Sequence, residues 1–109
     1  MTCEPWDVVT VPFPFTDRAS QKRRPALIVS KKNFNRNGHS LMAMITTAPA
    51  AWPGDSPISQ WAACGLSAPC SVRLKLFTLD NRLIVKRIGR LSDEDKNRVT
   101  AALKAILPF

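Results

Sequence analysis

The stretch Lys22-Arg23-Arg24-Pro25-Ala26-Leu27-Ile28-Val29-Ser30 places three cations directly before four consecutive apolar residues. Pro25 has its own φ fixed near about −65° and disfavours helical backbone at the residue before it, so Arg24 is expected to be extended. Residues 26–29 show no polar alternation, which is typical of a strand buried on both faces. The stretch therefore predicts a buried strand that holds a guanidinium at its beginning.

A second apolar run, residues 41–45, ends in Thr46-Thr47. The dipeptide Asn37-Gly38 between the runs is a turn signal, because both residues tolerate positive φ. If the runs pair in phase as antiparallel strands, the residues that face each other are Ser30 and Ser40, Ile28 and Met42, Ala26 and Met44, and Arg24 and Thr46. A slip of one residue would instead turn Thr46 to the other face and place Thr47 on the face of Arg24.

The chain has 109 residues, which suits a single domain spanning residues 1–109 with a substantial core. Its formal net charge is +8. The cations gather in two stretches, Arg18, Lys22, Arg23, Arg24, Lys31, Lys32 and Arg36, then Arg73, Lys75, Arg82, Lys86, Arg87 and Arg90. Such a surface favours a polyanionic partner, most often nucleic acid.

Other classes of protein are disfavoured by the sequence. Cys3, Cys64 and Cys70 form no Cys-x-x-Cys motif, and the chain contains a single histidine, His39, so we expect no metal site and no cofactor. The apolar runs are far shorter than the roughly 20 residues of a membrane helix, and no signal peptide opens the chain. We expect a cytoplasmic protein that does not enter a membrane.

The segment between the first expected strand, residues 6–11, and Arg24 mixes aromatic rings with cations. This composition suits stacking on unpaired bases while the phosphates are neutralised. The RNA-binding candidates here are Phe15, Arg18, Lys22 and Arg23. The alternative for the aromatic rings is that they plug the end of the barrel.

Residues 70–76 alternate apolar with polar side chains, as in a half-exposed strand. Ser71, Arg73 and Lys75 are then expected to point outward, and the two cations are further RNA-binding candidates. Residues 58–61 predict a short edge strand and residues 83–90 another strand, while the proline-rich residues 48–57 predict an exposed loop.

A helix is expected from about Asp93 to Leu107, because Ser92 precedes three acidic residues and Pro108 ends the segment. Its apolar face, expected to pack on the core, consists of Val99, Ala102, Leu103 and Ile106. Short strands followed by one helix predict a mainly β fold, a strongly bent antiparallel sheet or small barrel capped by the helix.

The ordered motifs resemble the MazF/PemK family of bacterial toxins, the endoribonucleases of type II toxin-antitoxin systems. The matching residues are Asp7-Val8-Val9, Val11-Pro12-Phe13-Pro14-Phe15, residues 23–30, Ile45-Thr46-Thr47, Leu76-Phe77-Thr78-Leu79-Asp80 and residues 88–95. The resemblance implies an SH3-like barrel with a C-terminal helix, a homodimer, metal-independent and sequence-selective cleavage of single-stranded RNA by 2′-OH attack, and inhibition by a cognate antitoxin.

The family's catalytic Arg and Thr correspond to Arg24 and Thr46, with Thr47 beside them as an RNA-binding candidate. A loop serine that assists in some members corresponds to Ser20. The family commonly has glycine before Asp7, where this chain has Trp6.

Two other functions remain open at the level of sequence. One is a non-catalytic toxin on the same barrel, resembling the gyrase-binding CcdB group. The other is a general module that binds single-stranded RNA without cutting it, with an affinity that falls as salt rises.

Overall fold

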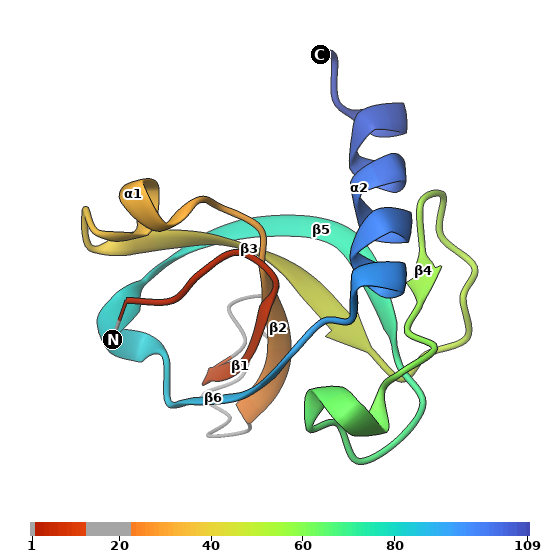
Figure 1. Ribbon diagram of the computed structural model, residues 1–109, viewed down its shortest axis with the longest axis horizontal. Helices are drawn as coiled ribbons and strands as arrows, with labels where there is room; N and C mark the ends of the chain where they lie inside the picture. Colours follow the sequence, from red (N-terminus) through yellow and green to blue (C-terminus); the bar gives the residue numbers. More distant parts are fainter. Residues whose placement is uncertain (1, 13–22) are drawn as a thin grey trace.

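The computed structural model describes residues 2–12 and 23–109. Within these residues the strands are β1 (Asp7–Pro12), β2 (Arg23–Ile28), β3 (His39–Thr46), β4 (Ser56–Pro57), β5 (Ser71–Asp80) and β6 (Lys86–Arg90). The helical segments within the same residues are α1 (Lys32–Asn35), η1 (Ala62–Cys64), η2 (Asn81–Leu83) and α2 (Asp93–Ile106). Figure 1 shows the chain in this order.

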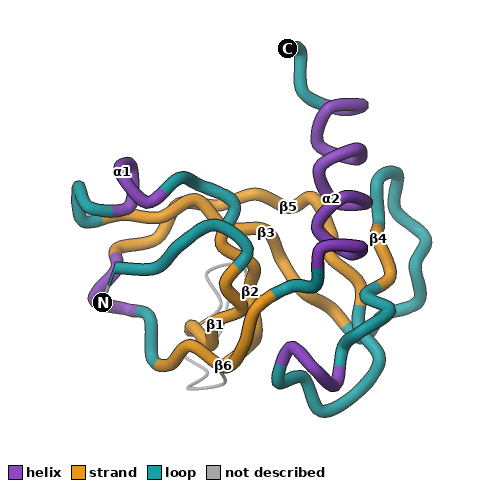
Figure 2. Tube along the Cα trace, in the orientation of Figure 1, coloured by secondary structure: helices purple, strands orange, loops and turns teal. Residues whose placement is uncertain are grey.

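The sheet has the strand order β4-β5-β3-β2-β1-β6, and each described pair is antiparallel. β3 and β5 curve strongly, and α2 stands beside β4 with its C-terminal half rising away from the strands (Figures 1 and 2). The predicted mainly β architecture, a bent antiparallel sheet with a C-terminal helix, is confirmed. Within the described residues, no helix is both long and apolar enough to span a membrane.

The register of β2 on β3 organises the sheet. Ala26 pairs with Met44, Leu27 with Ala43, and Ile28 with Met42, so the predicted in-phase register is confirmed for these residues. Ala26, Leu27 and Ile28 are completely buried. This two-sided burial explains why the sequence shows no polar alternation there, and it opposes any slip of the register.

The two faces of the sheet carry separate hydrophobic clusters. The first cluster contains the buried residues Val8, Leu27, Ala43, Ile45, Ile58, Cys64, Leu66, Val72, Leu91 and Val99. The second cluster contains Cys3, Val9, Val11, Ala26, Ile28, Met42, Phe77 and Ile84. Because neighbouring residues of a strand point to opposite faces, membership of a cluster shows which face a position belongs to.

Several predicted boundaries need correction. Residues 58–61 are not a strand, since the short edge strand is Ser56–Pro57 and the chain then turns into η1. The strand expected at residue 83 begins only at Lys86, because Asp80 accepts a hydrogen bond from the Arg82 N–H and caps η2. On α2, Val99 is buried but Ile106 is 50% exposed, so the expected core face ends early.

A buried polar network fixes the connection between β2 and β3, where the sequence indicated only a turn. Asn35 of α1 is fully buried, and its Nδ2 donates to the carbonyl oxygens of Cys3 (2.8 Å) and Ser30 (3.1 Å). Asn81 Nδ2 donates to the carbonyl oxygen of Asn35 at 2.6 Å. Gly38 supplies the positive φ of the turn, +99°.

Asp95 joins α2 to the segment before η1. Its buried carboxylate accepts hydrogen bonds from the Ser59 and Gln60 backbone N–H groups at 3.0 Å each, and from the Ser59 hydroxyl and Arg98. Burial raises the pKa of Asp95, but these hydrogen bonds together outweigh burial and lower it from 3.8 to about 2. The ionised carboxylate is therefore the form that holds the helix in place.

Trp6, which stands where the MazF/PemK family commonly has glycine, has a φ of +74°. Its N–H donates to the Ile28 carbonyl oxygen at 2.7 Å, and its carbonyl oxygen accepts from the Leu91 N–H at 2.9 Å. These bonds hold the residue in a backbone conformation that side chains disfavour. The half-buried indole packs against the first cluster, which offsets part of that cost.

Substitutions of Trp6 separate the free-energy cost of its positive φ from the stabilisation that packing of the indole provides. Trp6→Gly and Trp6→Ala both lose the ring, but only glycine adopts positive φ without strain. We expect Trp6→Gly to be about 1 kcal/mol more stable than Trp6→Ala in urea unfolding, the reverse of the usual order. An alanine variant as stable as the glycine variant would contradict the claim that the backbone at position 6 is strained for residues other than glycine.

The Asp95 pKa predicts acid sensitivity. A carboxylate with a depressed pKa stabilises the fold above its unfolded pKa and loses this effect as the pH falls through the folded pKa. Between pH 3.8 and about 2 we expect Asp95 to account for a loss of about 2 kcal/mol in the free energy of unfolding. Asp95→Asn should lack this component in urea titrations at stepped pH. The exposed Asp93→Asn, in the same helical turn, should retain it.

Candidate functional site

Arg24 on β2 and Thr46 at the end of β3 lie on the two central strands of the sheet. The observed register, continued by two residues beyond Ala26 and Met44, sets Arg24 opposite Thr46. Alternation along the strands then assigns Arg24 to the face of Ala26 and Ile28, and Thr46 to the face of Met42. Both positions therefore share the face of the second cluster.

The adjoining strands agree with this placement. Arg24 pairs across β1 with Val11, a member of the second cluster. Thr46 pairs across β5 with Ser71. Arg24 and Thr46 are both half-buried, so each is partly accessible to solvent. Together Arg24, Thr46 and Ser71 form a polar corner at one end of an otherwise apolar face.

The hydroxyl of Thr46 is held by the turn that follows it. Its Oγ1 accepts a hydrogen bond from the Ala48 backbone N–H at 3.1 Å. Because the oxygen is the acceptor in this bond, the hydroxyl hydrogen is available for donation to a ligand. Thr47 follows Thr46 and is exposed.

The expectation that Arg73 and Ser71 point outward is wrong. Arg73 is 9% exposed and Ser71 is 6% exposed, because the segment from Thr47 to β4 folds over this end of β5. Arg73 donates from Nε to Asp55 Oδ1 at 3.2 Å and from Nη2 to Asp55 Oδ2 at 3.0 Å. Arg73 therefore anchors this segment instead of extending into solvent.

Asp55 also organises its own loop. Its Oδ2 accepts hydrogen bonds from the backbone N–H groups of Ala51 (3.1 Å) and Trp52 (3.0 Å). The hydrogen bonds from Arg73, with these two, hold the pKa of Asp55 below 3.8 although burial opposes them. The buried carboxylate thus stays ionised, and its hydrogen bonds close a turn over residues 51–55 in the loop between β3 and β4.

Trp52 lies over the cations of β5. Its ring centroid is 4.9 Å from the Arg73 guanidinium carbon and 4.7 Å from Lys75 Nζ, within the range of cation–π contacts. Trp52 is 45% exposed, and Lys75 is half-buried. The RNA-binding candidate Lys75 is therefore partly accessible beside an aromatic ring.

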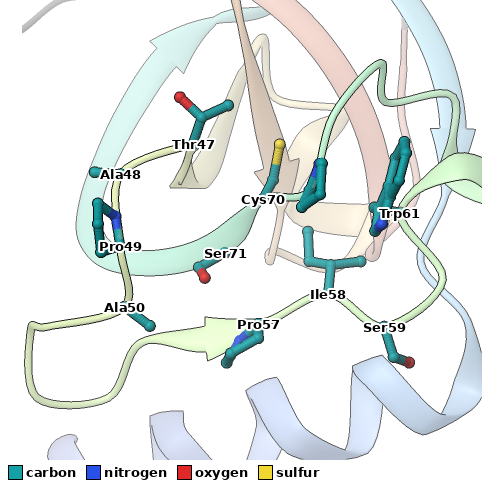
Figure 3. Close-up of a pocket in the computed structure, with 11 residues that line it drawn as sticks. Thr47, Ala48, Pro49, Ala50, Pro57, Ile58, Ser59, Trp61, Cys70 and Ser71 are labelled. Atoms are coloured by element: carbon teal, nitrogen blue, oxygen red, sulfur yellow. The ribbon is translucent and has the colours of Figure 1, made fainter.

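A pocket of about 470 Å³ is lined by the turn that begins at Thr47, by β4 and by the start of β5 (Figure 3). Four segments form it, namely the turn after β3, β4 with the residues after it, Trp61, and the start of β5. The residues that line it are Thr47, Ala48, Pro49, Ala50, Pro57, Ile58, Ser59, Trp61, Pro69, Cys70 and Ser71. Most of the wall is apolar, with hydroxyl and thiol groups interspersed.

The remaining predicted RNA-binding residues divide into two groups. Arg23 and Thr47 are exposed. Arg23 is the first residue of β2, next to Arg24, and Thr47 directly follows β3, next to Thr46. Four others lie outside the described residues, namely Phe15, Arg18, Ser20 and Lys22.

The pocket is the feature that reasoning from the sequence missed. Trp61 was assigned to an edge strand and Ser71 to an outward face, and neither pattern indicates a concave surface. The only available signal was the density of prolines at residues 49, 53, 57 and 69, which marks loops that cannot pair as regular strands.

Comparison with known proteins shows the family of this chain. Residues 4–107 match the family described as "PemK-like, MazF-like toxin of type II toxin-antitoxin system". The chain therefore belongs to the MazF/PemK family of toxins. No curated protein matches the sequence.

Several solved structures share the fold at low sequence identity. One is an endoribonuclease in complex with its cognate antitoxin from Mycobacterial species, with TM-score 0.77, 19% identity, and coverage of 99% of this chain and 97% of that chain. Another is the Mycobacterium tuberculosis toxin MazF-mt6, with TM-score 0.74, 20% identity, and coverage of 91% and 93%. A third is MazE-MazF (Form-II) from Deinococcus radiodurans, with TM-score 0.78, 17% identity, and coverage of 100% and 98%.

The buried pair of Asp55 and Arg73 should be essential for stability. Asp55→Ala leaves the Arg73 guanidinium buried without its counter-charge, and we expect a loss of about 3 kcal/mol or more in urea unfolding at neutral pH. Glu94→Ala is the matched control, because Glu94 forms an ion pair with Arg98 while 64% of its side chain is exposed. That variant should lose less than about 1 kcal/mol. Equal losses would contradict the anchoring role.

Proposed function

We propose that this protein is the toxin of a type II toxin-antitoxin system and acts as a metal-independent, sequence-selective endoribonuclease on single-stranded RNA. The observation that carries the proposal is the register of β2 on β3, which assigns Arg24 and Thr46 to one face at one end of the sheet. Membership of the MazF/PemK family supports it.

The proposed reaction uses a nucleophile that the substrate carries. The ribose O2′ attacks the adjacent phosphorus as its proton leaves, and the bond from phosphorus to the 5′-oxygen of the next nucleotide breaks as that oxygen gains a proton. The products are a 2′,3′-cyclic phosphate and a 5′-hydroxyl end. Because the nucleophile is already adjacent to phosphorus, the enzyme needs to position the phosphate and stabilise charge.

Arg24 would stabilise the charge that develops on the non-bridging phosphate oxygens. A guanidinium stays protonated at neutral pH and can donate two parallel hydrogen bonds to a phosphate. The half-buried position of Arg24 supports this role, because a partly desolvated donor interacts with developing charge more strongly than a solvated one. Pro25 after it fixes the backbone direction.

Thr46 would donate a hydrogen bond to the same phosphate group. The hydrogen bond from the Ala48 N–H occupies its oxygen as an acceptor, which leaves the hydroxyl hydrogen for the substrate. A hydroxyl held in this way helps to keep the phosphate in line for attack by O2′.

The RNA would extend from this corner over neighbouring cations. Arg23 and Thr47 are exposed and adjoin Arg24 and Thr46 in the sequence, and Lys75 is half-buried on β5. Phe15, Arg18, Ser20 and Lys22 precede β2 in the sequence. Arg73 is buried, so it would contribute to RNA binding only indirectly, through its contact with the partly exposed Trp52 ring. The net charge of +8 favours attraction of RNA and also of an acidic protein segment.

We propose a cognate antitoxin and a second copy of the chain as protein partners. The support comes from related folds, since one similar structure is described as an endoribonuclease in complex with its cognate antitoxin, and another as MazE-MazF. An acidic antitoxin segment that covers the polar corner would compete with RNA for the same cations.

The test is cleavage of a defined RNA by purified protein in EDTA, with both ends of the products identified. Wild-type protein should leave 2′,3′-cyclic phosphate and 5′-hydroxyl ends. Arg24→Ala should slow cleavage by about 10²-fold to 10³-fold, and Thr46→Val by about 10²-fold, because each removes a donor to the transition state. Lys104→Ala, a charge change on an exposed residue of α2, should leave the rate close to that of wild type.

Circular dichroism of each variant shows whether it is folded. Full activity of folded Arg24→Ala would disprove the mechanism. RNA that stays intact but is bound in a salt-dependent manner would indicate the non-catalytic RNA-binding module instead. Intact RNA together with trapped gyrase-DNA complexes would indicate the gyrase-binding alternative.

A further inference from the structure

The side chain of Thr46 is oriented by the turn that directly follows β3. Its Oγ1 accepts a hydrogen bond from the Ala48 backbone N–H at 3.1 Å, so the rotamer that Thr46 adopts depends on where Ala48 lies. Figure 3 shows Ala48 and Pro49 after Thr47, on the stretch of chain that leads to β4. Both residues are exposed, so packing around them contributes little to fixing their position. The orientation of the Thr46 hydroxyl therefore depends on the contact that holds this turn.

Arg73 of β5 supplies such a contact. It pairs across to β3 with Met44, so it lies on the same face of the sheet as Thr46, two residues further along β3. Its Nη2 donates a long hydrogen bond, 3.4 Å, to the carbonyl oxygen of Pro49, which directly follows Ala48. Arg73 thus connects the sheet to the turn within one residue of the N–H group that binds Thr46 Oγ1.

Asp55 holds the Arg73 guanidinium in this position. Nε and Nη2 of Arg73 donate to the two carboxylate oxygens of Asp55 at 3.2 and 3.0 Å. The Arg73 side chain is 11% exposed and the Asp55 side chain 2%, so this pair is largely removed from water and its two hydrogen bonds are charge-assisted. Because Nη2 carries two hydrogens in a rigid plane, it can donate to Asp55 and to Pro49 together. The pair therefore fixes both the loop around Asp55 and the turn after β3.

From these contacts we infer that Arg73 and Asp55 are positioning residues for the reaction, and that they act through the turn to orient the Thr46 hydroxyl towards the scissile phosphate. This inference rests on the proposed ribonuclease function. Neither residue of the pair needs to contact the substrate, since the guanidinium holds Pro49 and the neighbouring Ala48 N–H binds Thr46. A hydroxyl that rotates away from the phosphate loses its hydrogen bond in the transition state, where small misplacements slow the reaction strongly.

A double substitution removes this contact without leaving a buried charge. Arg73→Met combined with Asp55→Asn replaces both charged groups, and loss of both partners of a buried pair destabilises a protein far less than loss of one. The amide oxygen introduced at position 55 can still accept from the backbone N–H groups of Ala51 and Trp52, which bind Asp55 Oδ2 in the wild-type protein. The variant therefore isolates the connection between the sheet and the turn.

The matched control makes the same two changes at the other end of β5. Arg82→Met combined with Asp80→Asn removes an ion pair whose arginine side chain is 90% exposed. Asp80 pairs with His39, the first residue of β3, whereas Thr46 is the last. If the Arg73 double variant does not fold by circular dichroism, Arg73→Lys makes the same test, because an ammonium keeps the charge but lacks the planar fork.

The orientation of Thr46 can be measured by NMR without any RNA. Three-bond couplings from the Thr46 methyl carbon to its backbone nitrogen and carbonyl carbon report the χ1 rotamer. We expect one staggered rotamer in the wild-type protein and in the control, and an average over several rotamers in the Arg73→Met, Asp55→Asn variant. A wild-type rotamer in the folded variant would overturn the inference, whether or not the protein cleaves RNA.

Cleavage kinetics provide the second measurement. In the Arg73→Met, Asp55→Asn variant, kcat and kcat/KM should fall together by about tenfold, because the affected hydrogen bond acts in the transition state. In a Thr46→Val background the same two substitutions should have little further effect, since the hydroxyl through which they act is absent. The control should leave both constants close to those of wild type.

The two measurements separate the inference from the proposed function. A rise in KM alone, or an equal loss with and without the Thr46 hydroxyl, would show that the pair supports the loop in another way and would overturn the inference while leaving the nuclease intact. If the wild-type protein does not cleave RNA, the proposed function fails, and averaging of the Thr46 rotamer in the variant would still support the orienting role of the pair.

Discussion

The pairing of β2 with β3 is the constraint on which the rest of this molecule depends. Its residues are buried on both faces, so the hydrophobic effect fixes the register from two sides at once, and a one-residue slip would misplace Leu27 and Ile28 together. The same register assigns the polar ends of the two strands to one face. A packing requirement in the core thus sets the relation between Arg24 and Thr46.

The segments around this pair are held by buried polar contacts. Asp55 and Arg73 fasten the loop after Thr46, and Asp95 fastens the segment before η1 to α2. The pocket is lined by residues of the two segments that these anchors hold, residues 47–50 in the first and Ser59 in the second. Loops held in this way are already ordered before a substrate binds, which reduces the conformational entropy lost on binding.

The sequence was informative where burial is reflected in residue pattern. The two apolar runs predicted β2, β3 and their register, and Ser92 with the acids after it predicted the start of α2. The sequence pattern predicted burial wrongly where a segment distant in the sequence covers a strand. Ser71 and Arg73 alternate with apolar residues as outward side chains do, and only the loop folding back from Thr47 buries them. Likewise, Ile106 continues the helical apolar pattern, yet it is 50% exposed and its side chain lies against Gly54 of the loop before β4.

The central claim is that Arg24 and Thr46 act on the same phosphate, and a double-mutant cycle on kcat/KM for RNA cleavage tests it most directly. Arg24→Ala, Thr46→Val and the double variant are compared with wild type under identical conditions. Groups that act as a unit give strongly non-additive losses, so the double variant should be little slower than the slower single variant. Losses that multiply would show that the two side chains act independently, and would contradict the account.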